Sequence, residues 1–230
     1  MNLQTAGGPP GLAALLAGEV ARRLRAALAA RPLASLVLSG GRTPLPFFEA
    51  LAREPLEWAR VGVTLADERW VDARSADSNE RLVREHLLAG PARAANFVSL
   101  RTGAHDPTAA LAERRAALAT LAHPFDVVVL GMGDDGHTAS LFPGAEGIES
   151  ALDPAASPGL IALTPPAAPH RRISMNLAML LDSRWIAVHV LGESKRALLE
   201  QAERASAPRE HPIAAVLRQH KVPVDVYWAP

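Results

Sequence analysis

The chain has 230 residues and a mass of 24.4 kDa, enough for one large domain or two small ones. Apolar residues make up 49% and charged residues 21%, which is typical of a globular protein with a core and not of a disordered chain. Because 24 Lys and Arg residues balance 24 Asp and Glu residues, the sequence argues against a general nucleic-acid binder. Cysteine is absent, which excludes disulfides, thiolate nucleophiles and cysteine-bound zinc.

The N-terminal segment predicts a helix rather than a targeting sequence. Its apolar stretch has no basic region before it and is interrupted by Glu19, so it is a poor secretory signal. A cluster of arginines at 22–25 could mimic a transit peptide, but a helix with one apolar face fits the spacing better. That face is expected to hold Leu12, Leu15, Leu16, Val20, Leu24 and Leu28. No apolar run approaches the roughly 18 residues that span a bilayer. We expect a cytoplasmic protein that binds neither membrane nor nucleic acid.

Beyond this helix, apolar runs that predict strands alternate with amphipathic runs that predict helices. Strands are expected at 35–41, 61–70, 96–100, 125–133, 159–164, 173–177, 185–192 and 222–228. Helices are expected at 43–52, 77–91, 108–122 and 193–203. The alternation predicts an α/β fold of three layers, a Rossmann-like open and mostly parallel sheet with helices on both faces. Since no linker or repeat appears, residues 1–230 are expected to form a single domain.

The first polar cluster is the segment SGGRTP, between a predicted strand and helix. Ligands in open α/β sheets bind beyond the carboxyl ends of strands, where this segment falls. Gly40 and Gly41 allow a tight turn, while Thr43 suits the N-cap of the following helix and Pro44 its first position. The segment is therefore either a phosphate site at a helix N-terminus or an ordinary capped turn.

The second cluster is Asp67-Glu68-Arg69, directly after an apolar strand. These three ionisable residues would lie either at the mouth of a cleft or in a solvated loop. Ser78 and Asn79, a few residues later, are both explained by capping the next helix.

The third cluster, GMGDDGHTAS, follows the strand at 125–133 and formally matches the dinucleotide fingerprint GxGxxG. We reject that interpretation because two aspartates would face the pyrophosphate and because Pro143-Gly144 breaks the helix that should follow. The segment instead sets His137 beside Asp135, a pairing suited to a general base. A metal site formed by Asp134, Asp135 and His137 is conceivable, but no recognised ligand spacing supports it.

Two further cations lie near predicted strand ends. Arg172 begins the strand at 173–177, and Lys195 follows the strand at 185–192. Each is either a surface cation or part of a phosphate clamp.

Six segments, taken in order, resemble the 6-phosphogluconolactonase family over nearly the whole chain. They are SGGRTP, ADERWV, DSNERLV, LGMGDDGHTASLFPG, HRRISMN and LGESKRALL. The resemblance implies hydrolysis of 6-phospho-D-glucono-1,5-lactone to 6-phosphogluconate, the second step of the oxidative pentose phosphate pathway, with no metal or organic cofactor. It also implies the fold of glucosamine-6-phosphate deaminase and ribose-5-phosphate isomerase. Deaminases typically read HIAFNEP after the histidine, with a glutamate that supports ring opening, where this chain reads HTASLFP.

The resemblance also implies roles for individual residues. His137 would be the general base and Asp135 would orient it, while Arg69 would stabilise negative charge and Asp67 would position the substrate or that arginine. The sugar phosphate would be held by Gly40, Gly41, Thr43, Arg172 and Lys195. The alternatives are a deaminase-like enzyme and a non-catalytic sugar-phosphate sensor, and a monomer or small homo-oligomer is expected in either case. The chain departs from the family at Arg196, where alanine is usual, and in its short C-terminus.

Overall fold

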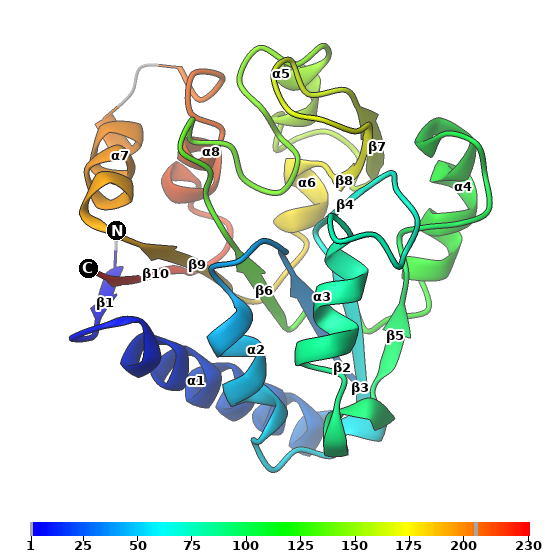
Figure 1. The fold of residues 1–230 in the computed structure, drawn as a ribbon, viewed down its shortest axis with the longest axis vertical. Helices are drawn as coiled ribbons and strands as arrows, with labels where there is room; N and C mark the ends of the chain where they lie inside the picture. The colour runs from blue at the N-terminus through cyan, green and yellow to red at the C-terminus, as the bar shows by residue number, and fades with distance from the viewer. Residues whose placement is uncertain (1, 205–206) are drawn as a thin grey trace.

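The computed structural model describes residues 2–204 and 207–230 and contains two sheets (Figure 1). The larger has seven strands in the order β1-β10-β9-β6-β2-β3-β5, and every neighbouring pair is parallel. Its strands are β1 (Asn2–Thr5), β2 (Ala34–Leu38), β3 (Val61–Leu65), β5 (Asn96–Val98), β6 (Val127–Leu130), β9 (Ile186–Leu191) and β10 (Val224–Ala229). The smaller, antiparallel sheet has the order β4-β8-β7, with β4 (Asp67–Arg69), β7 (Leu160–Leu163) and β8 (Arg172–Met175).

Helices lie on both faces of the seven-stranded sheet, which confirms the expected fold class. In Figure 1, α1 and α2 lie on the side opposite to α6 and α8. The α-helices are α1 (Pro9–Ala30), α2 (Leu45–Ala52), α3 (Asn79–His86), α4 (Pro107–Leu118), α5 (Ile148–Ala151), α6 (Leu177–Leu180), α7 (Glu193–Arg204) and α8 (Ile213–Arg218). Two 3₁₀ turns are η1 (Trp58–Arg60) and η2 (Gly90–Ala94). Among the described helices, none is long and apolar enough to cross a membrane.

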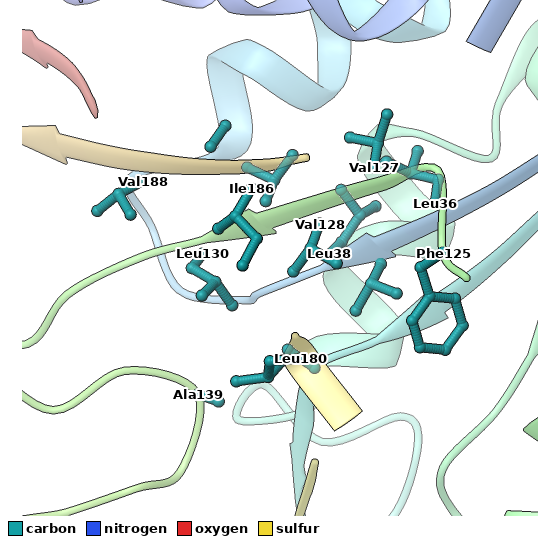
Figure 2. Close-up of a cluster of buried hydrophobic side chains, with 14 of the residues drawn as sticks. Leu36, Leu38, Phe125, Val127, Val128, Leu130, Ala139, Leu180, Ile186 and Val188 are labelled. Carbon is teal, nitrogen blue, oxygen red and sulfur yellow. The ribbon is translucent and has the colours of Figure 1, made fainter. Parts of the chain in front are cut away.

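The central strands β2 and β6 are buried along their whole length. Parallel strands covered on both faces read as continuous apolar runs, as ASLVL and VVVL do. Figure 2 shows Leu36 and Leu38 of β2 beside Val128 and Leu130 of β6, with Leu180 of α6 on the side of the sheet away from α2. Burying each such side chain contributes roughly 1.5–3 kcal/mol, so this cluster fixes the position of the strand ends that carry the polar segments.

One detail of α1 was predicted wrongly. Leu15 is 44% exposed, whereas Leu12, Leu16 and Val20 are fully buried. At 100° per residue, the buried stripe runs through positions four residues apart and their neighbours Ala13 and Ala17. Leu15 falls outside that stripe, so its apolar side chain faces solvent.

The order of the strands in the larger sheet explains where a ligand site can form. From β2 the chain moves to β3 and β5 on one side, whereas from β6 it moves to β9 and β10 on the other. The neighbours β2 and β6 therefore flank the topological switch point, where open α/β sheets bind their ligands. The segments leaving these two strands begin at Ser39 and Gly131 and carry the first and third polar clusters.

Candidate active site

A cavity of about 290 Å³ lies at this switch point. Eight of the nine residues predicted from the sequence line it, namely Gly40, Gly41, Thr43, Asp67, Arg69, His137, Arg172 and Lys195. The ninth, Asp135, lies directly behind the ring of His137. The structure thus brings together residues that are separated by up to 155 positions in the sequence, because the turn after β2, the strands β4 and β8, the loop after β6 and the start of α7 all line the cavity.

The turn after β2 needs glycine at two positions for different reasons. A Cβ on Gly40 would lie 1.9 Å from Oδ1 of Asn79, so a side chain there would collide with the start of α3. Gly41 has a φ of +97°, which favours glycine. The predicted N-cap at Thr43 is wrong: the cap position is Pro44, and no side chain caps α2. The backbone turns one residue later than expected, through the bond from the Leu45 amide to the Arg42 carbonyl.

His137 is held on a tight turn beside Asp135. Its Nδ1 lies 2.6 Å from Oδ1 of Asp135, and its backbone amide donates to the same oxygen at 3.0 Å. A Cβ on Gly133 would lie 2.1 Å from the ring, so glycine leaves the space that the imidazole fills. On its other side the ring stacks on Phe142, with centroids 4.1 Å apart.

The carboxylate behind the histidine is stabilised in its charged form. Burial acts to raise the pKa of Asp135, but the hydrogen bonds from the backbone amide and ring of His137, with the positive charge of that ring when it is protonated, outweigh this effect, so the net pKa lies below its ordinary value. An ionised Asp135 can only accept, so it fixes the proton of His137 on Nδ1 and leaves Nε2 as an acceptor. This is the arrangement that a general base requires.

The small antiparallel sheet brings two arginines to the cavity. β4 pairs with β8 so that Arg69 stands opposite Arg172. Like charges directly opposite each other on a sheet destabilise it, so this pair is suited to an anionic ligand. Asp67 on the same strand accepts a hydrogen bond of 2.5 Å from Ser140, which ties β4 to the loop that carries His137. The second cluster is therefore a strand with two buried residues and not a solvated loop.

Arg172 is only 6% exposed. Its guanidinium lies over the ring of Phe142 at 5.5 Å and donates to the carbonyl of Pro169 at 3.3 Å, while its Nε lacks a hydrogen-bond partner among the described residues. Burial lowers the pKa of Arg172, and the nearby Asp67 carboxylate opposes that change. Phe142 thus contacts both Arg172 and His137.

Lys195 lies in the first turn of α7 and donates to the Met132 carbonyl at 2.7 Å. It also lies 3.6 Å from Asp134, which is one of the three residues of the conceivable metal site. In the part of the chain that the structure describes, no group of three His, Asp or Glu side chains is arranged to hold a metal.

Comparison with known proteins identifies the family of the chain. A family model described as glucosamine-6-phosphate isomerases/6-phosphogluconolactonase matches residues 9–228. The chain belongs to this family. A protein of Pseudomonas putida named 6-phosphogluconolactonase is 50% identical over 219 residues, covering 95% of this chain and 89% of the relative. A second of that name, from Rhizobium meliloti strain 1021, is 44% identical over 100% of this chain and 99% of the relative.

Solved structures of the glucosamine-6-phosphate isomerase/6-phosphogluconolactonase family superpose closely. A 6-phosphogluconolactonase from Shewanella baltica OS155 has a TM-score of 0.96 and 43% identity, covering 100% of this chain and 98% of that one. A monomeric glucosamine-6-phosphate deaminase of the NagB superfamily has a TM-score of 0.76 over 98% of this chain and 97% of that one. At 19% identity it shows the shared fold alone. Both the resemblance and the expected fold class are therefore confirmed.

Four residues of the site were not assigned to it from the sequence. Asn79 was interpreted only as part of a helix cap, whereas the cap is Ser78, and Asn79 packs on Gly40 and donates to the Asp67 carbonyl at 2.9 Å. Phe142 and Ser140 belong to the segment that carries His137, but no spacing rule gives their contacts. His189 lies inside an apolar strand, where its polarity was the only signal.

Proposed function

We propose that the chain hydrolyses 6-phospho-D-glucono-1,5-lactone to 6-phosphogluconate, as a carboxylic ester hydrolase of the oxidative pentose phosphate pathway. Relatives up to 50% identical that carry the name 6-phosphogluconolactonase support this reaction. The observation that carries the proposal is the 2.6 Å contact between His137 and Asp135 in a cavity that also holds Arg69 and Arg172. It combines a base with cations suited to a phosphorylated substrate.

Hydrolysis of the lactone requires a base that activates water and a group that stabilises the negative charge on the carbonyl oxygen. Nε2 of His137 takes a proton from water as the water oxygen attacks the carbonyl carbon of the lactone. The carbonyl oxygen becomes negatively charged and is stabilised by Arg69, which donates to the Asp77 carbonyl at 2.5 Å and is thereby held at the rim of the cavity. Collapse of this intermediate breaks the bond between the carbonyl carbon and the ring oxygen, which takes the proton from His137.

The other residues hold the reactants. Asp135 keeps the imidazole in one tautomer and stabilises its protonated form. Asp67 positions the substrate or Arg69, and its contact with Ser140 keeps that strand against the loop of His137. The phosphate is bound at the start of α2 by Gly40, Gly41, Thr43, Arg172 and Lys195, where the helix dipole and two cations favour a dianion.

The alternative activity is that of a glucosamine-6-phosphate deaminase. The segment after His137 reads HTASLFP and lacks the glutamate that supports ring opening in deaminases. A non-catalytic sugar-phosphate sensor is the other alternative. A cytoplasmic location and a monomeric or small homo-oligomeric state remain predictions.

A substrate comparison tests the proposal. The purified protein is given freshly prepared 6-phosphogluconolactone in a coupled assay, with the spontaneous hydrolysis subtracted, and separately glucosamine 6-phosphate. We expect accelerated lactone hydrolysis and no release of ammonia. Ammonia release without lactone turnover would assign the deaminase activity instead, and binding of both compounds without turnover would favour the sensor.

A further inference from the structure

Buried polar atoms without hydrogen-bond partners are concentrated at the cavity. Among the residues that the structure describes, six side chains carry such atoms, and four of them line this one cavity: Ser39, Asn79, Arg172 and His189. Native proteins leave few buried polar groups unpaired, so a concentration of them indicates where a polar ligand is bound. His189 stands out because both of its ring nitrogens lack a partner.

His189 lies on β9 near the carboxyl edge of the sheet. Val188, its neighbour, pairs with Leu130 at the end of β6, so His189 is level with the start of the segment that carries His137. Its ring meets Phe47, in the first turn of α2, edge to face with centroids 6.2 Å apart. The chain then passes through Gly192 to Lys195. His189 therefore lies on the α2 side of the cavity.

The two walls of the cavity carry different groups. The loop at 137–142 lies on the side of the sheet away from α2, as Figure 2 shows for Ala139 and Leu180. The small sheet with Arg69 and Arg172 lies on that side too (Figure 1), so Arg172 would reach the phosphate from across the cavity. The α2 side presents the turn at 39–44, the start of α2 and His189. His189 is thus placed with the 39–44 turn and the start of α2 rather than with the proposed base.

The environment of His189 is opposite to that of His137. His189 is 4% exposed and has no carboxylate partner among the described residues, and burial lowers its pKa to about 4. At neutral pH the ring is uncharged and carries one N–H donor. A neutral donor with no orienting carboxylate is poorly suited to removing a proton, but it is suited to donating a hydrogen bond to a ligand oxygen.

We propose that His189 is a phosphate-binding residue, whose neutral ring N–H donates a hydrogen bond to an oxygen of the substrate phosphate beside the start of α2 and Lys195. This inference rests on the proposed function for the identity of the substrate. The His189 side chain adds a hydrogen-bond donor from β9 to the groups that the 39–44 turn and α7 provide. Donors from three segments would hold the phosphate in one position.

Kinetics of two variants test the assignment. His189→Leu removes the donor, and His189→Gln keeps an N–H of similar reach. A hydrogen bond to a charged group corresponds to about 10–150-fold in affinity, so His189→Leu should raise KM for the phosphorylated lactone by that factor with little change in kcat. Turnover of unphosphorylated gluconolactone should hardly change, and His189→Gln should recover most of the loss. His220→Gln, an exposed histidine, is the matched control and should change neither constant.

Equal losses on both lactones, or a His189→Gln variant as impaired as His189→Leu, would contradict the proposal and leave His189 a packing residue. A second measurement uses the unmodified protein and inorganic phosphate, and it does not depend on lactonase activity. The imidazole ¹⁵N signals of His189 should shift as phosphate is added, while those of His220 should not. Unshifted His189 signals at saturating phosphate would overturn the assignment even if the lactone reaction is confirmed.

Discussion

Gly133 determines the position of the His137 ring, because a Cβ at that residue would lie 2.1 Å from the imidazole and 2.9 Å from the Asp135 carboxylate. We expect Gly133→Ala to push the ring away from its carboxylate and to lower kcat, while the protein stays folded. Gly131→Ala is the comparison, since a Cβ there meets nothing within 4 Å. Circular dichroism and lactone kinetics of both variants are the measurements. Equal kcat for the two would show that the position of the ring does not matter.

Arg172 and Lys195 are proposed to contact the substrate phosphate, which is remote from the reacting carbonyl. Their contacts should therefore be similar in the ground and transition states. Arg172→Ala should raise KM for the phosphorylated lactone by about 10–150-fold and should hardly affect unphosphorylated gluconolactone. Lys195→Ala should behave alike but more weakly, because lysine presents a point charge where arginine presents a fork. Arg171→Ala, next in the chain and exposed, is the control.

The kinetics of Arg172→Ala on the two lactones also distinguish between two roles for this arginine, at the phosphate or at the reacting carbonyl. Phe142 contacts both Arg172 and His137, and Arg69 stands opposite Arg172 in the small sheet. Equal losses on both lactones would mean that Arg172 acts at the reacting carbonyl, and the phosphate would then be held by the 39–44 turn and Lys195.

Among single residues, the sequence predicts those whose functional contacts are made to near neighbours in the chain. His137 and Asp135 are two positions apart, so their contact follows from a tight turn. His189 and Asn79 reach the cavity only because β9 ends and α3 begins beside it, and no local pattern contains that information. Phe142 was missed because an aromatic side chain in a loop has no spacing rule that assigns it to a neighbour.

Among the elements, β4 shows how tertiary contacts override local preference. Three charged residues disfavour a strand, yet Asp67–Arg69 pairs with β8. Glu68 supplies the reason: its two carboxylate oxygens accept from the amides of Arg69, Asn79 and Glu80 at 2.7–2.8 Å and from the hydroxyl of Ser78 at 3.0 Å. The side chain therefore joins β4 to the N-terminus of α3.

Glu68→Gln should loosen that junction. An amide can accept at one oxygen only, and its NH₂ group would face two donors, which leaves buried N–H groups unpaired at a cost of about 1–3 kcal/mol in unfolding free energy. Lactone kcat/KM should fall as well, because Asn79 and Arg69 depend on this contact. Glu85→Gln, on the exposed face of the same helix, should change stability by no more than about 0.5 kcal/mol. Denaturant unfolding of both variants checks the difference, and equal stabilities would contradict it.

Each strand and helix that the sequence predicts has a counterpart in the structure, from the long helix α1 to short strands such as β5 and β7. The sequence did not predict β1, because NLQT is polar and forms a strand only through parallel pairing with β10. Nor did it predict a second sheet, since β4, β7 and β8 are short and are defined by pairing across the chain. The last strand, β10, is well packed: Val226 and Ala229 are fully buried, and Arg196 stacks on Trp228 at 4.6 Å.

For the whole molecule, the buried His189 predicts a pH dependence of stability. Its pKa is about 4 in the folded protein against an ordinary value of 6.5, so between these values the unfolded chain binds more protons than the folded one. Stability should therefore fall as pH decreases from about 6.5 to 4, by on the order of 3 kcal/mol from this residue. Urea unfolding of the wild type and His189→Gln across that range measures it.

The two proteins should differ in slope, with the wild type losing more stability toward low pH. Parallel curves would mean that His189 titrates alike in both states. The same unfolding curves test the predicted single domain, which requires one cooperative transition with coincident fluorescence and circular dichroism signals.

The proposed reaction depends most on a histidine, His137, that activates water at the topological switch point. The direct measurement is kcat for 6-phosphogluconolactone hydrolysis by the wild type and by folded His137→Asn, corrected for spontaneous opening of the lactone. General base catalysis contributes about 10²–10⁴-fold, so we expect kcat to fall by that factor while the substrate still binds. A folded His137→Asn enzyme with near-normal kcat would contradict the account.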